Sequence, residues 1–454
     1  MSTVDTAANS RRVAVVGGGV LGMVLGLRLA QAGHRPVVYE AGPGFGGLAS
    51  ADRIGAYTWD RFYHVILMSD RRLRSLLREV GLESALKWST TKTGFFVDES
   101  FHYLSTALDF LRFPPIGLVD KARLGATILR AATIRNWRPL EEETAIEWLT
   151  RWSGQRVVDR LWKPLLRAKL GANDELVSAA FIWAIIARMY GARKTEAKKE
   201  MFGYVEGGYA AILAALERYS REQGVELIAS APVREVRSSP DGPGVCLETT
   251  GGAVERFDAA VLTLPCPLVV TTCPQLTAAE RKRHESVVYQ GMICASMLTK
   301  TPLSDCYITN LTDERLPFTA VIEMTALVDR QRFDGKSLIY LPRYVRQDDP
   351  AWDQSDDAIQ ASFLDALTRV HPRFDRGDVS AFQIARARHV LALSTLNYSR
   401  DSMPEWKTTV PGVYVANSAQ IANGTLNVNE TLGVVERILP SILQDLPQAR
   451  REAA

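Results

Sequence analysis

The sequence predicts an α/β fold, and three observations carry that prediction. Residues 12–50 alternate an apolar run, a glycine turn, an amphipathic helix and a second apolar run. Residues 65–200 are rich in helical periodicity, whereas short strand-like runs follow residue 226. At 454 residues the chain is too long for one simple core, so we expect two domains.

The first strand is expected at Val13 to Val16, and it runs directly into three glycines, Gly17 to Gly19. Gly22 completes a G-x-G-x-x-G spacing, and the apolar rhythm from Leu21 to Ala32 predicts a helix. A strand, tight turn and helix in this order direct backbone N–H groups and the positive end of a helix dipole at one point. A pyrophosphate binds well at such a point.

A second apolar run, Pro36 to Tyr39, predicts a strand parallel to the first. Glu40 follows it at the distance where an acid accepts hydrogen bonds from ribose hydroxyls. Gly17 allows the turn, Gly19 lets a phosphate approach the backbone, and Gly22 lets the helix pack close to the strand. We therefore expect a Rossmann-like dinucleotide site, and the alternative is a purely structural glycine turn.

A second glycine pair indicates which dinucleotide is bound. Glu40-Ala41 is followed by Gly46-Gly47, and this E-A-x-x-x-x-G-G extension resembles the two-dinucleotide-binding-domain flavoproteins. The resemblance implies FAD, with the glycine pair beneath its second phosphate and ribityl chain, whereas NAD dehydrogenases usually lack that pair. It places these residues at the cofactor: Gly17, Gly19, Val20, Leu21, Gly22, Glu40, Ala41, Gly46, Gly47, Leu48 and Ala49.

The middle of the chain extends the resemblance. Gly207-Gly208 precedes a helix expected over 210–223, and strands are expected at 226–229, 233–238, 245–249, 253–257 and 259–264. This order resembles the flavin amine oxidase superfamily, which includes protoporphyrinogen oxidases, carotenoid desaturases, amine oxidases and, more distantly, UDP-galactopyranose mutase. The resemblance implies that Val233 contacts the adenine of FAD through its backbone.

The C-terminal motif resembles the superfamily with a departure. A strand from Gly412 to Ala416 leads to Asn417-Ser418, where the superfamily has Gly-Asp. The resemblance implies that a helix from about Asn429 to Leu439 directs its N–H groups toward the flavin pyrimidine. It places Asn417, Ser418, Thr425, Asn427 and Asn429 at the cofactor. Read from the residues alone, Asn427 and Asn429 are helix caps.

The resemblance also implies the domain plan, a discontinuous Rossmann-like FAD-binding domain plus a mixed α+β substrate domain with an antiparallel sheet. The FAD-binding segments are expected at 11–64, 201–275 and 399–445, and the substrate segments at 65–200 and 276–398. Residues 1–10 and 446–454 are expected to be disordered tails. In the substrate part we expect strands at 93–97, 101–104, 291–298, 319–327 and 337–344, a helix over 356–370, and a segment 386–398 that returns toward the flavin.

Candidate catalytic residues follow the second glycine pair, where superfamily chains run along the isoalloxazine edge. His64 is a candidate base or orienting group because imidazole titrates near working pH, and the alternative is a structural histidine. Tyr63 and Arg61 are alternates for binding an anionic group. His389 and Tyr398 are secondary candidates for the pocket.

One difference bears on the reaction. In superfamily amine oxidases a lysine holds a water near flavin N5, and its place here falls at or near Cys294. Lys300 lies farther along the chain. This argues against a dedicated amine oxidase, and Cys294 is read as a buried small apolar residue.

The expected function is that of an FAD-dependent oxidoreductase of the desaturase, dehydrogenase or oxidase type, moving hydride to flavin N5 from an apolar or lipid-like small molecule. The alternatives are a nonredox isomerase resembling UDP-galactopyranose mutase and a catalytically inactive flavin-binding scaffold. A second nicotinamide fingerprint is not found mid-chain, so electrons are expected to pass to oxygen or another acceptor. FAD is expected to bind noncovalently, because the C-terminal motif holds no Cys or His.

Composition limits the partners. A net charge of +3 without a basic tract gives no reason to expect nucleic acid, and five cysteines without a C-x-x-C pair give none to expect a disulfide scaffold or metal site. We expect a cytoplasmic protein, with membrane association as the alternative. The apolar stretch Leu176 to Met189 is interpreted as a buried helix, and the alternative is an interfacial patch joined by Arg112 to Ile116 and by Trp137, Trp148, Trp152 and Trp162. The sequence predicts no oligomeric state.

Overall fold

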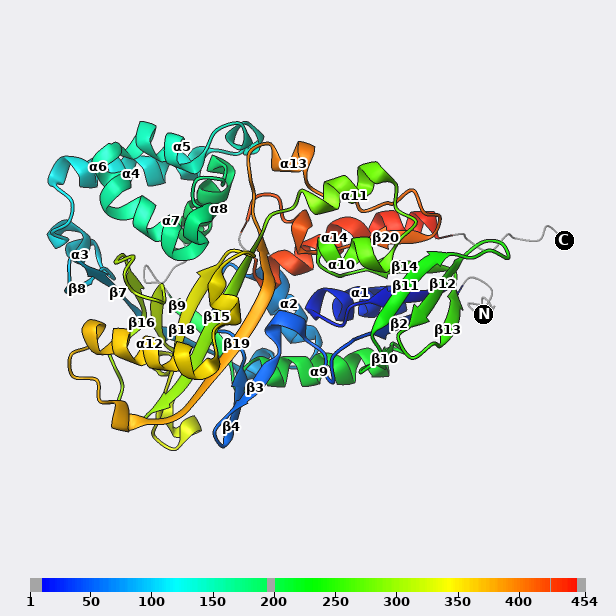
Figure 1. Ribbon diagram of the computed structural model, residues 1–454, viewed down its shortest axis with the longest axis horizontal. Helices are drawn as coiled ribbons and strands as arrows, with labels where there is room; N and C mark the ends of the chain where they lie inside the picture. Colours follow the sequence, from blue (N-terminus) through cyan, green and yellow to red (C-terminus); the bar gives the residue numbers. More distant parts are fainter. Residues whose placement is uncertain (1–9, 194–200, 425, 447–454) are drawn as a thin grey trace.

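The computed structural model describes residues 10–193, 201–424 and 426–446. The chain is built around two large sheets that lie side by side, a parallel sheet near both termini and a mostly antiparallel sheet toward the opposite end (Figure 1). The predicted fold class, a Rossmann-like part combined with a mixed α+β part, is confirmed. The expected tails, apart from Ser10 and Leu446, lie outside the described residues.

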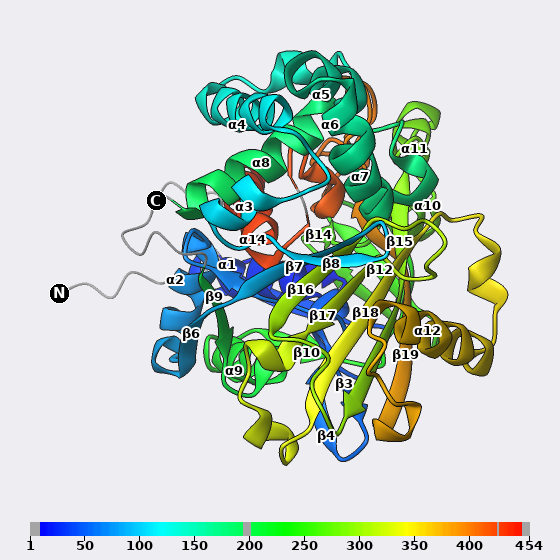
Figure 2. The same ribbon diagram turned by 90° about the vertical axis from the view of Figure 1, so that its left-hand side faces the viewer.

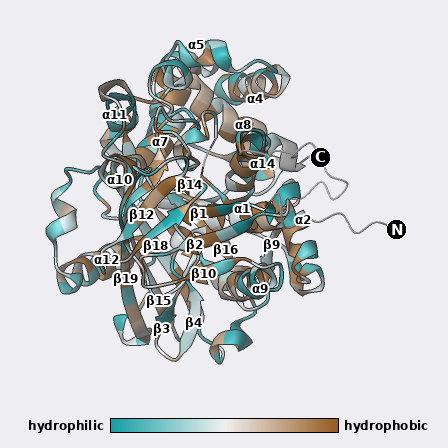
Figure 3. Cartoon of the chain, turned by 90° about the vertical axis from the view of Figure 1, so that its right-hand side faces the viewer, coloured by the Kyte–Doolittle hydropathy of each residue, from teal (hydrophilic) through white to brown (hydrophobic). Residues whose placement is uncertain are grey.

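The parallel sheet has five strands in the order β10-β2-β1-β14-β20, and every neighbouring pair in it is parallel. Because β1 pairs with β2 on one side and with β14 on the other, the chain reverses its strand order at β1, where such sheets bind ligands. Figure 3 shows the apolar character of these central strands. The strands are β1 (Arg12–Val16), β2 (Arg35–Tyr39), β10 (Glu226–Ile228), β14 (Ala259–Leu262) and β20 (Val413–Val415).

Alternate residues of these strands point to opposite faces, and each face has its own core. Val13 and Val15 of β1 pack with four helices, α1 (Val20–Gln31), α2 (Arg71–Glu79), α9 (Gly208–Glu222) and α14 (Val428–Asp445). Ala14 and Val16 pack against a three-stranded antiparallel sheet, whose strands were predicted, and against one helix, which was not. These are β11 (Val233–Ser238), β12 (Val245–Thr249), β13 (Val254–Phe257) and α10 (Cys266–Thr272), which is followed by α11 (Ala278–Glu285).

The second sheet has seven strands in the order β19-β15-β18-β17-β16-β7-β8, antiparallel except for the β16–β7 pair. Helix α12 (Asp356–Val370) covers one face, where Ile293 and Ala295 of β15 meet Phe363 and Leu367. The other face contacts Trp59 and Phe62 from the N-terminal part. The strands are β7 (Lys92–Val97), β8 (Ser100–Tyr103), β15 (Tyr289–Thr299), β16 (Cys306–Leu311), β17 (Ala320–Glu323), β18 (Ser337–Val345) and β19 (Val379–Ala392).

Three sequence-based boundaries were wrong. The strand expected over 319–327 ends at Glu323, because a 3₁₀ turn occupies Met324–Ala326. Residues 386–392 of the segment 386–398 are the second half of the long edge strand β19, which begins at Val379 and ends at Ala392. Most residues of β19 are only half-buried, so a period of two was hard to recognise. The helix expected from Asn429 to Leu439 runs from Val428 to Asp445 and continues through Pro440.

Small sheets and a helical layer complete the chain (Figure 1). Strands β3 (Ala51–Ile54) and β4 (Tyr57–Asp60) form a hairpin, and β9 (Met201–Val205) lies between β5 (Ile66–Leu67) and β6 (Leu86–Thr90). The helices are α3 (Ala107–Arg112), α4 (Leu118–Thr133), α5 (Ala145–Ser153), α6 (Gln155–Val157), α7 (Lys163–Leu170), α8 (Ala179–Arg193) and α13 (Tyr398–Asp401). A π-helical turn, Val158–Trp162, and several short 3₁₀ turns connect them.

The apolar stretch of the sequence forms most of α8, and its first residues, from Ala179 to Ile182, are buried. This agrees with a buried helix. Two of the other aromatic candidates for an interfacial patch are wrong, because Phe113 and Trp148 are each only 2% exposed and belong to cores. Among the described residues, no helix has both the length and the apolar character needed to cross a bilayer.

Candidate active site

The glycine turn lies at the C-terminal edge of β1. Gly17 has a φ of +112°, a conformation that glycine adopts far more readily than other residues. A Cβ atom at Gly22 would lie 1.9 Å from the carbonyl oxygen of Gly17, so glycine is required there by packing. A Cβ atom at Gly19 would meet nothing within 4 Å, and Gly19 is the N-cap of α1. The first N–H groups of α1 therefore point at open space, which suits an anion.

Glu40 lies beside this turn. Its carboxylate accepts hydrogen bonds from the backbone N–H groups of Gly18 and Gly42, each at 2.8 Å. The chain after β10 runs next to it, since Ala231 donates its backbone N–H to the Glu40 carbonyl at 2.9 Å. Val233, two residues farther on, is half-buried at the start of β11. The structure thus brings Glu40 and the segment before Val233 to one edge of the sheet.

The second glycine pair contacts the first. Gly46 donates its backbone N–H to the carbonyl of Gly18 at 2.8 Å, and a Cβ atom at Gly47 would lie 3.2 Å from the Cα of Gly19. Both glycines have positive φ, 120° and 58°. The two loops therefore form one continuous backbone surface. Of the other predicted residues nearby, Val20, Leu21 and Ala49 are buried, Leu48 is half-buried and Ala41 is exposed.

The C-terminal candidates are placed mainly by local hydrogen bonds. The buried Asn417 donates its side-chain amide to the Leu264 carbonyl at 2.8 Å and accepts from the Ala419 N–H at 3.0 Å. Ser418, next to it, is half-buried. Asn427 is the N-cap of α14 and accepts from the Glu430 N–H at 3.0 Å. Thr425 lies outside the described residues.

Asn429 caps a different helix from the one that contains it. Its side-chain oxygen accepts from the backbone N–H groups of Arg72 and Leu73, at 3.0 and 3.4 Å, in the first turn of α2. The bond ties α14 to α2. Its role in the structure is therefore to position the beginning of α14, and direct contact with a cofactor stays a prediction.

A buried acid lies next to the predicted histidine. Asp60 accepts a hydrogen bond of 2.7 Å from the Tyr209 N–H at the beginning of α9, and its carboxylate lies 3.8 Å from His64 Nδ1. Burial raises the pKa of Asp60 to about 7 and lowers the pKa of His64 to about 4. Among the described residues the Nδ1 of His64 has no hydrogen-bond partner. His64 is therefore neutral at physiological pH, and its free nitrogen is able to accept or donate one hydrogen bond.

Tyr63 reaches the second sheet, where a group of phenols gathers. Its hydroxyl lies 2.9 Å from the hydroxyl of Tyr344, and its ring lies 6.3 Å from that of Tyr340. Burial raises the pKa of Tyr63 well above its usual value, so its phenol is neutral. The Tyr340 hydroxyl donates to the Asp60 carbonyl at 2.6 Å, and the ammonium of Lys169 on α7 lies 5.6 Å from the Tyr344 ring centre. We call Tyr63, Tyr340 and Tyr344, together with His64, which follows Tyr63 in the chain, the phenol–imidazole cluster. The His64 ring itself packs on Tyr209, with ring centres 4.6 Å apart.

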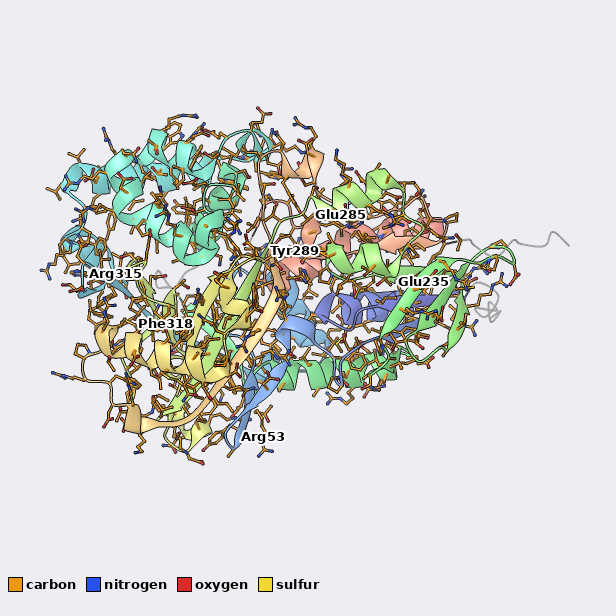
Figure 4. All side chains as sticks on the ribbon, in the orientation of Figure 1. Arg53, Glu235, Glu285, Tyr289, Arg315 and Phe318 are labelled. Carbon is orange, nitrogen blue, oxygen red and sulfur yellow. The ribbon has the colours of Figure 1, made fainter. Side chains whose placement is uncertain are left out.

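Three other candidates have contacts of their own. Arg61 is engaged in a two-point ion pair with Asp52, at 2.7 and 2.9 Å. His389 packs edge-on against Tyr289, the residue labelled near the middle of Figure 4. Tyr398 is wrong as a pocket residue, because it is 1% exposed and its hydroxyl donates to the Ala419 carbonyl.

The two candidates on β15 differ in exposure. Lys300 lies after the strand, 65% exposed, and contacts Gly377 and Asp378 at the surface. It is therefore excluded from the interior. Cys294 is 1% exposed, and burial raises its thiol pKa well above the ordinary value. It lies on the face of the sheet that meets Trp59, and its inert thiol agrees with a small apolar residue.

Sequence reasoning missed Asp60, Tyr344 and Lys169. Asp60 stands in the Y-T-W-D-R-F-Y-H run, but nothing in that run shows that Gly208 packs against its side chain, with a virtual Cβ 2.7 Å from Oδ1. Tyr344 and Lys169 come from β18 and α7, far along the chain. The alternation of β18 was a usable signal, since Tyr340 and Tyr344 occupy the same face.

The residues present fit a dinucleotide. Two glycine loops in contact, a helix beginning at an open position and an acid beside them are the features that a pyrophosphate and a ribose require. Tyr63 and His64 of the phenol–imidazole cluster follow Gly46 by seventeen and eighteen residues in the chain. Helix α9 contacts both regions, because Leu213 packs against Gly46 and Tyr209 packs on the His64 ring.

Comparisons with known proteins agree with this arrangement. The family of flavin containing amine oxidoreductases matches residues 22–427. A zeta-carotene-forming phytoene desaturase from Myxococcus xanthus is 26% identical over 317 residues, covering 63% of this chain and 59% of the relative. A carotenoid phi-ring synthase from Streptomyces griseus is 28% identical over 272 residues, covering 56% and 52%. The chain spans about three fifths of the length of the first curated relatives it matches.

Solved structures share the fold across nearly the whole chain. An oxidoreductase from Methanosarcina mazei superposes with a TM-score of 0.74 at 17% identity, covering 94% of this chain and 100% of its own. Putrescine oxidase bound to putrescine gives 0.71 at 17% identity, covering 96% and 99%. Reduced UDP-galactopyranose mutase gives 0.72 at 14% identity, covering 97% and 98%. At these identities the likeness is one of fold.

Proposed function

The chain belongs to the flavin containing amine oxidoreductase family, and from that premise we propose that it is an FAD-dependent oxidoreductase acting on an apolar or lipid-like small molecule. FAD is the cofactor of this family, and the glycine loops and Glu40 fit it. When bound, FAD supplies a two-electron acceptor for the substrate. The remaining steps rest on residues of this chain.

Cofactor binding is assigned to the edge of the parallel sheet. The open position at Gly19 and the first turn of α1 receive the pyrophosphate, and the Glu40 carboxylate accepts hydrogen bonds from the ribose. Because Gly46 and Gly47 have no side chains, they leave room for the cofactor where the two glycine loops meet. The dipole of α14 adds positive potential at the N-terminus of that helix, which Asn427 caps.

Substrate binding is assigned to the face of the second sheet that meets the N-terminal part. That face is apolar, with Met292, Ile322 and Leu338 among its buried residues. Two polar features lie beside it. They are the hydrogen-bonded hydroxyls of Tyr63 and Tyr344, and the Nδ1 atom of His64, which has no hydrogen-bond partner among the described residues. An apolar face with few polar groups favours a substrate that is apolar or has an apolar tail. The desaturases among the relatives support this class by their names.

A single observation carries the proposal. Helix α9 contacts both the glycine cradle and His64 of the phenol–imidazole cluster. Leu213 packs against Gly46, and Tyr209, one helical turn earlier, packs on the His64 ring with ring centres 4.6 Å apart, so the proposed cofactor and substrate positions lie close together. Such adjacency is what hydride removal from a C–H bond requires. Neutral His64 and neutral Tyr63 position the substrate and exclude water, and either is able to take a hydrogen bond from it.

The proposal is tested by anaerobic titration of the holoenzyme with phytoene and zeta-carotene in detergent micelles. Loss of one two-electron equivalent from the substrate should bleach the flavin absorbance stoichiometrically, and the product should contain one more double bond. Putrescine serves as the amine control and should leave the flavin oxidised. Bleaching by putrescine alone would move the assignment to an amine oxidase.

Two alternatives give different results in the same apparatus. An isomerase would convert its substrate only after prior reduction of the flavin, with no net redox change. A scaffold would bind FAD that neither these substrates nor dithionite reduces. Either result would overturn the oxidoreductase assignment while leaving the FAD site intact.

The cofactor is expected to be held without a covalent bond. The C-terminal motif that would face the flavin holds no Cys or His. Acid precipitation of the purified yellow protein should therefore release all flavin into the supernatant, as measured by its fluorescence. Flavin that stays with the precipitate would contradict this prediction.

NADH and NADPH are expected to reduce the flavin slowly and without saturation. A nicotinamide site needs a second open glycine cradle, but the mid-chain pair is closed: a Cβ atom at Gly208 would lie 2.7 Å from Asp60 Oδ1. In the part of the chain that the structure describes, one sheet alone is fully parallel. Stopped-flow reduction with each nucleotide, with and without substrate, measures this. Fast, saturable reduction by either nucleotide would refute it.

A further inference from the structure

Among the described residues, five of the eleven large apolar side chains that are exposed lie on two neighbouring helices, α3 and α4. Leu108 and Leu111 of α3 are 52% and 57% exposed, and Leu118, Val119 and Leu129 of α4 are 75%, 69% and 58% exposed. We call these five residues the leucine surface. Single exposed apolar residues are ordinary, but a group of this kind marks an interaction site.

The two helices that carry the five residues are in contact. The ammonium of Lys121, in the first turn of α4, donates to the Leu111 carbonyl at 2.7 Å and joins the two helices. At 100° per residue, Leu118, Ala122, Ala126 and Leu129 follow one side of α4, with Val119 beside them. The opposite side of α4 is buried through Leu124, Thr127 and Ala131. The apolar side is therefore separate from the side that packs on the protein.

The edge of the leucine surface is positively charged. Arg112, Arg123 and Arg130 are exposed beside it, and none of the three forms an ion pair with a described residue. Arg130 instead lies over the ring of Trp152, itself 38% exposed, at 5.2 Å. The acid of this helix, Asp120, is buried, and its side chain accepts from the Gly117 N–H at 3.2 Å. The exposed side of α4 thus carries arginines and no carboxylate.

The location leaves this surface accessible. Helices α3 and α4 lie at the end of the molecule opposite the two termini (Figure 1), and Figure 2 shows that end facing the viewer. Beneath them Phe113, Ile116 and Leu124 are buried in a separate hydrophobic core, and this core holds the two helices in place. The surface does not depend on the cofactor cradle, which lies on the parallel sheet.

We propose that the leucine surface docks this protein on an anionic phospholipid bilayer. The leucines enter the boundary of the acyl chains while Arg112, Arg123 and Arg130 reach lipid phosphates. Charge complementarity favours a lipid surface over a second copy of the chain, because two copies facing through this surface would bring the same unpaired arginines together. The inference goes beyond the proposed function and does not rest on it.

The test is cosedimentation of the full holoenzyme with vesicles of phosphatidylcholine alone or mixed equally with phosphatidylglycerol. The wild-type protein should bind the mixed vesicles more tightly than neutral ones, and added salt should weaken that preference. Replacing both Leu118→Ser and Val119→Ser should weaken partitioning by about tenfold or more, on the scale of partial burial of two apolar side chains. Arg123→Gln should weaken binding to the mixed vesicles about fivefold, and binding to neutral ones little.

Matched controls use residues of equal type elsewhere. Leu268→Ser on α10, 45% exposed, and Arg218→Gln on α9, 64% exposed in its side chain, should bind vesicles like the wild type. Thermal unfolding of every variant should be unchanged, because all of these side chains are exposed. Vesicle binding that the Leu118 and Val119 variant retains in full would overturn the proposal. The proposal would also be overturned if the wild type did not bind vesicles and formed a dimer in solution, while the Leu118 and Val119 variant was a monomer.

Cosedimentation measures vesicle binding and not flavin reduction, so its result is independent of the test of the proposed function. A protein that binds vesicles but oxidises no substrate keeps the docking surface and loses the proposed function. A protein that oxidises phytoene in micelles but ignores vesicles does the reverse.

Discussion

Replacing Gly19 by leucine is expected to abolish FAD binding while leaving the fold intact. A Cβ atom at this position meets nothing within 4 Å, and its φ of −66° and ψ of 173° suit any residue. The added side chain would fill the space in front of the first N–H groups of α1, where the pyrophosphate is assigned. We expect FAD affinity to fall by about 100-fold or more, on the order of 3 kcal/mol.

Flavin content after purification and titration of the apoprotein with FAD measure this effect. Gly125→Leu on α4 is the matched control, because a Cβ atom there also meets nothing within 4 Å and the site is remote. It should bind FAD normally. Gly22 is unsuitable as a test, since a Cβ atom 1.9 Å from the Gly17 carbonyl oxygen would damage the turn itself. A folded Gly19→Leu protein with normal flavin content would refute the site assignment.

Replacing Asp60 by asparagine is expected to stabilise the protein at alkaline pH. The carboxyl is 4% exposed, and burial raises its pKa to about 7 from an ordinary 3.8. A group whose pKa is raised on folding contributes its stability below the unfolded pKa and loses it as pH rises through the folded pKa. For Asp60 the loss runs from about pH 4 to about pH 7, and a difference of about three pKa units corresponds to roughly 4 kcal/mol.

Asparagine removes the charge and keeps the useful contacts. Its oxygen still accepts from the Tyr209 N–H, and its amide is able to donate to His64 Nδ1, which lies 3.8 Å from the present carboxylate and has no hydrogen-bond partner among the described residues. We expect a gain of roughly 2–4 kcal/mol in the free energy of unfolding at pH 8 and no gain below pH 4. Urea unfolding of FAD-saturated protein across this range measures it.

His64 gives this experiment an internal check. Its pKa is lowered to about 4, so its stability is present above the unfolded value of 6.5 and is lost as pH falls toward 4. Between pH 6.5 and pH 4, acidification of the wild type stabilises the fold through the buried Asp60, which binds its proton more tightly in the folded state, and destabilises it through the buried His64, which binds its proton less tightly there. The two effects partly cancel. The Asp60→Asn protein should therefore show a steeper fall in stability on acidification. Asp348→Asn, at an exposed surface acid, should change the free energy of unfolding by less than about 0.5 kcal/mol.

Much of the cofactor region could be predicted from the sequence because its determinants are local. A strand, three glycines, a helix and an acid within about thirty residues require one backbone arrangement whatever surrounds them. The strands β1, β2, β11 and β12 were predicted within a residue of their observed ends, since apolar runs and turn residues border them. The end of β17 was not, because a 3₁₀ turn at Met324–Ala326 interrupts the apolar run. The beginning of β19 was not, because its half-buried edge residues lack a clear period.

The parallel dinucleotide-binding unit and the family could be predicted from residues that act on their near neighbours. What surrounds the reactive region depends on contacts that form only in the folded chain. Asp60 became buried when Gly208 packed on it, Tyr63 met Tyr344 across 281 positions, and Phe113 turned inward while Leu118 stayed outside. The physical reason is that burial, and with it pKa and hydrogen-bond partners, is set by contacts between distant segments, which no local pattern records.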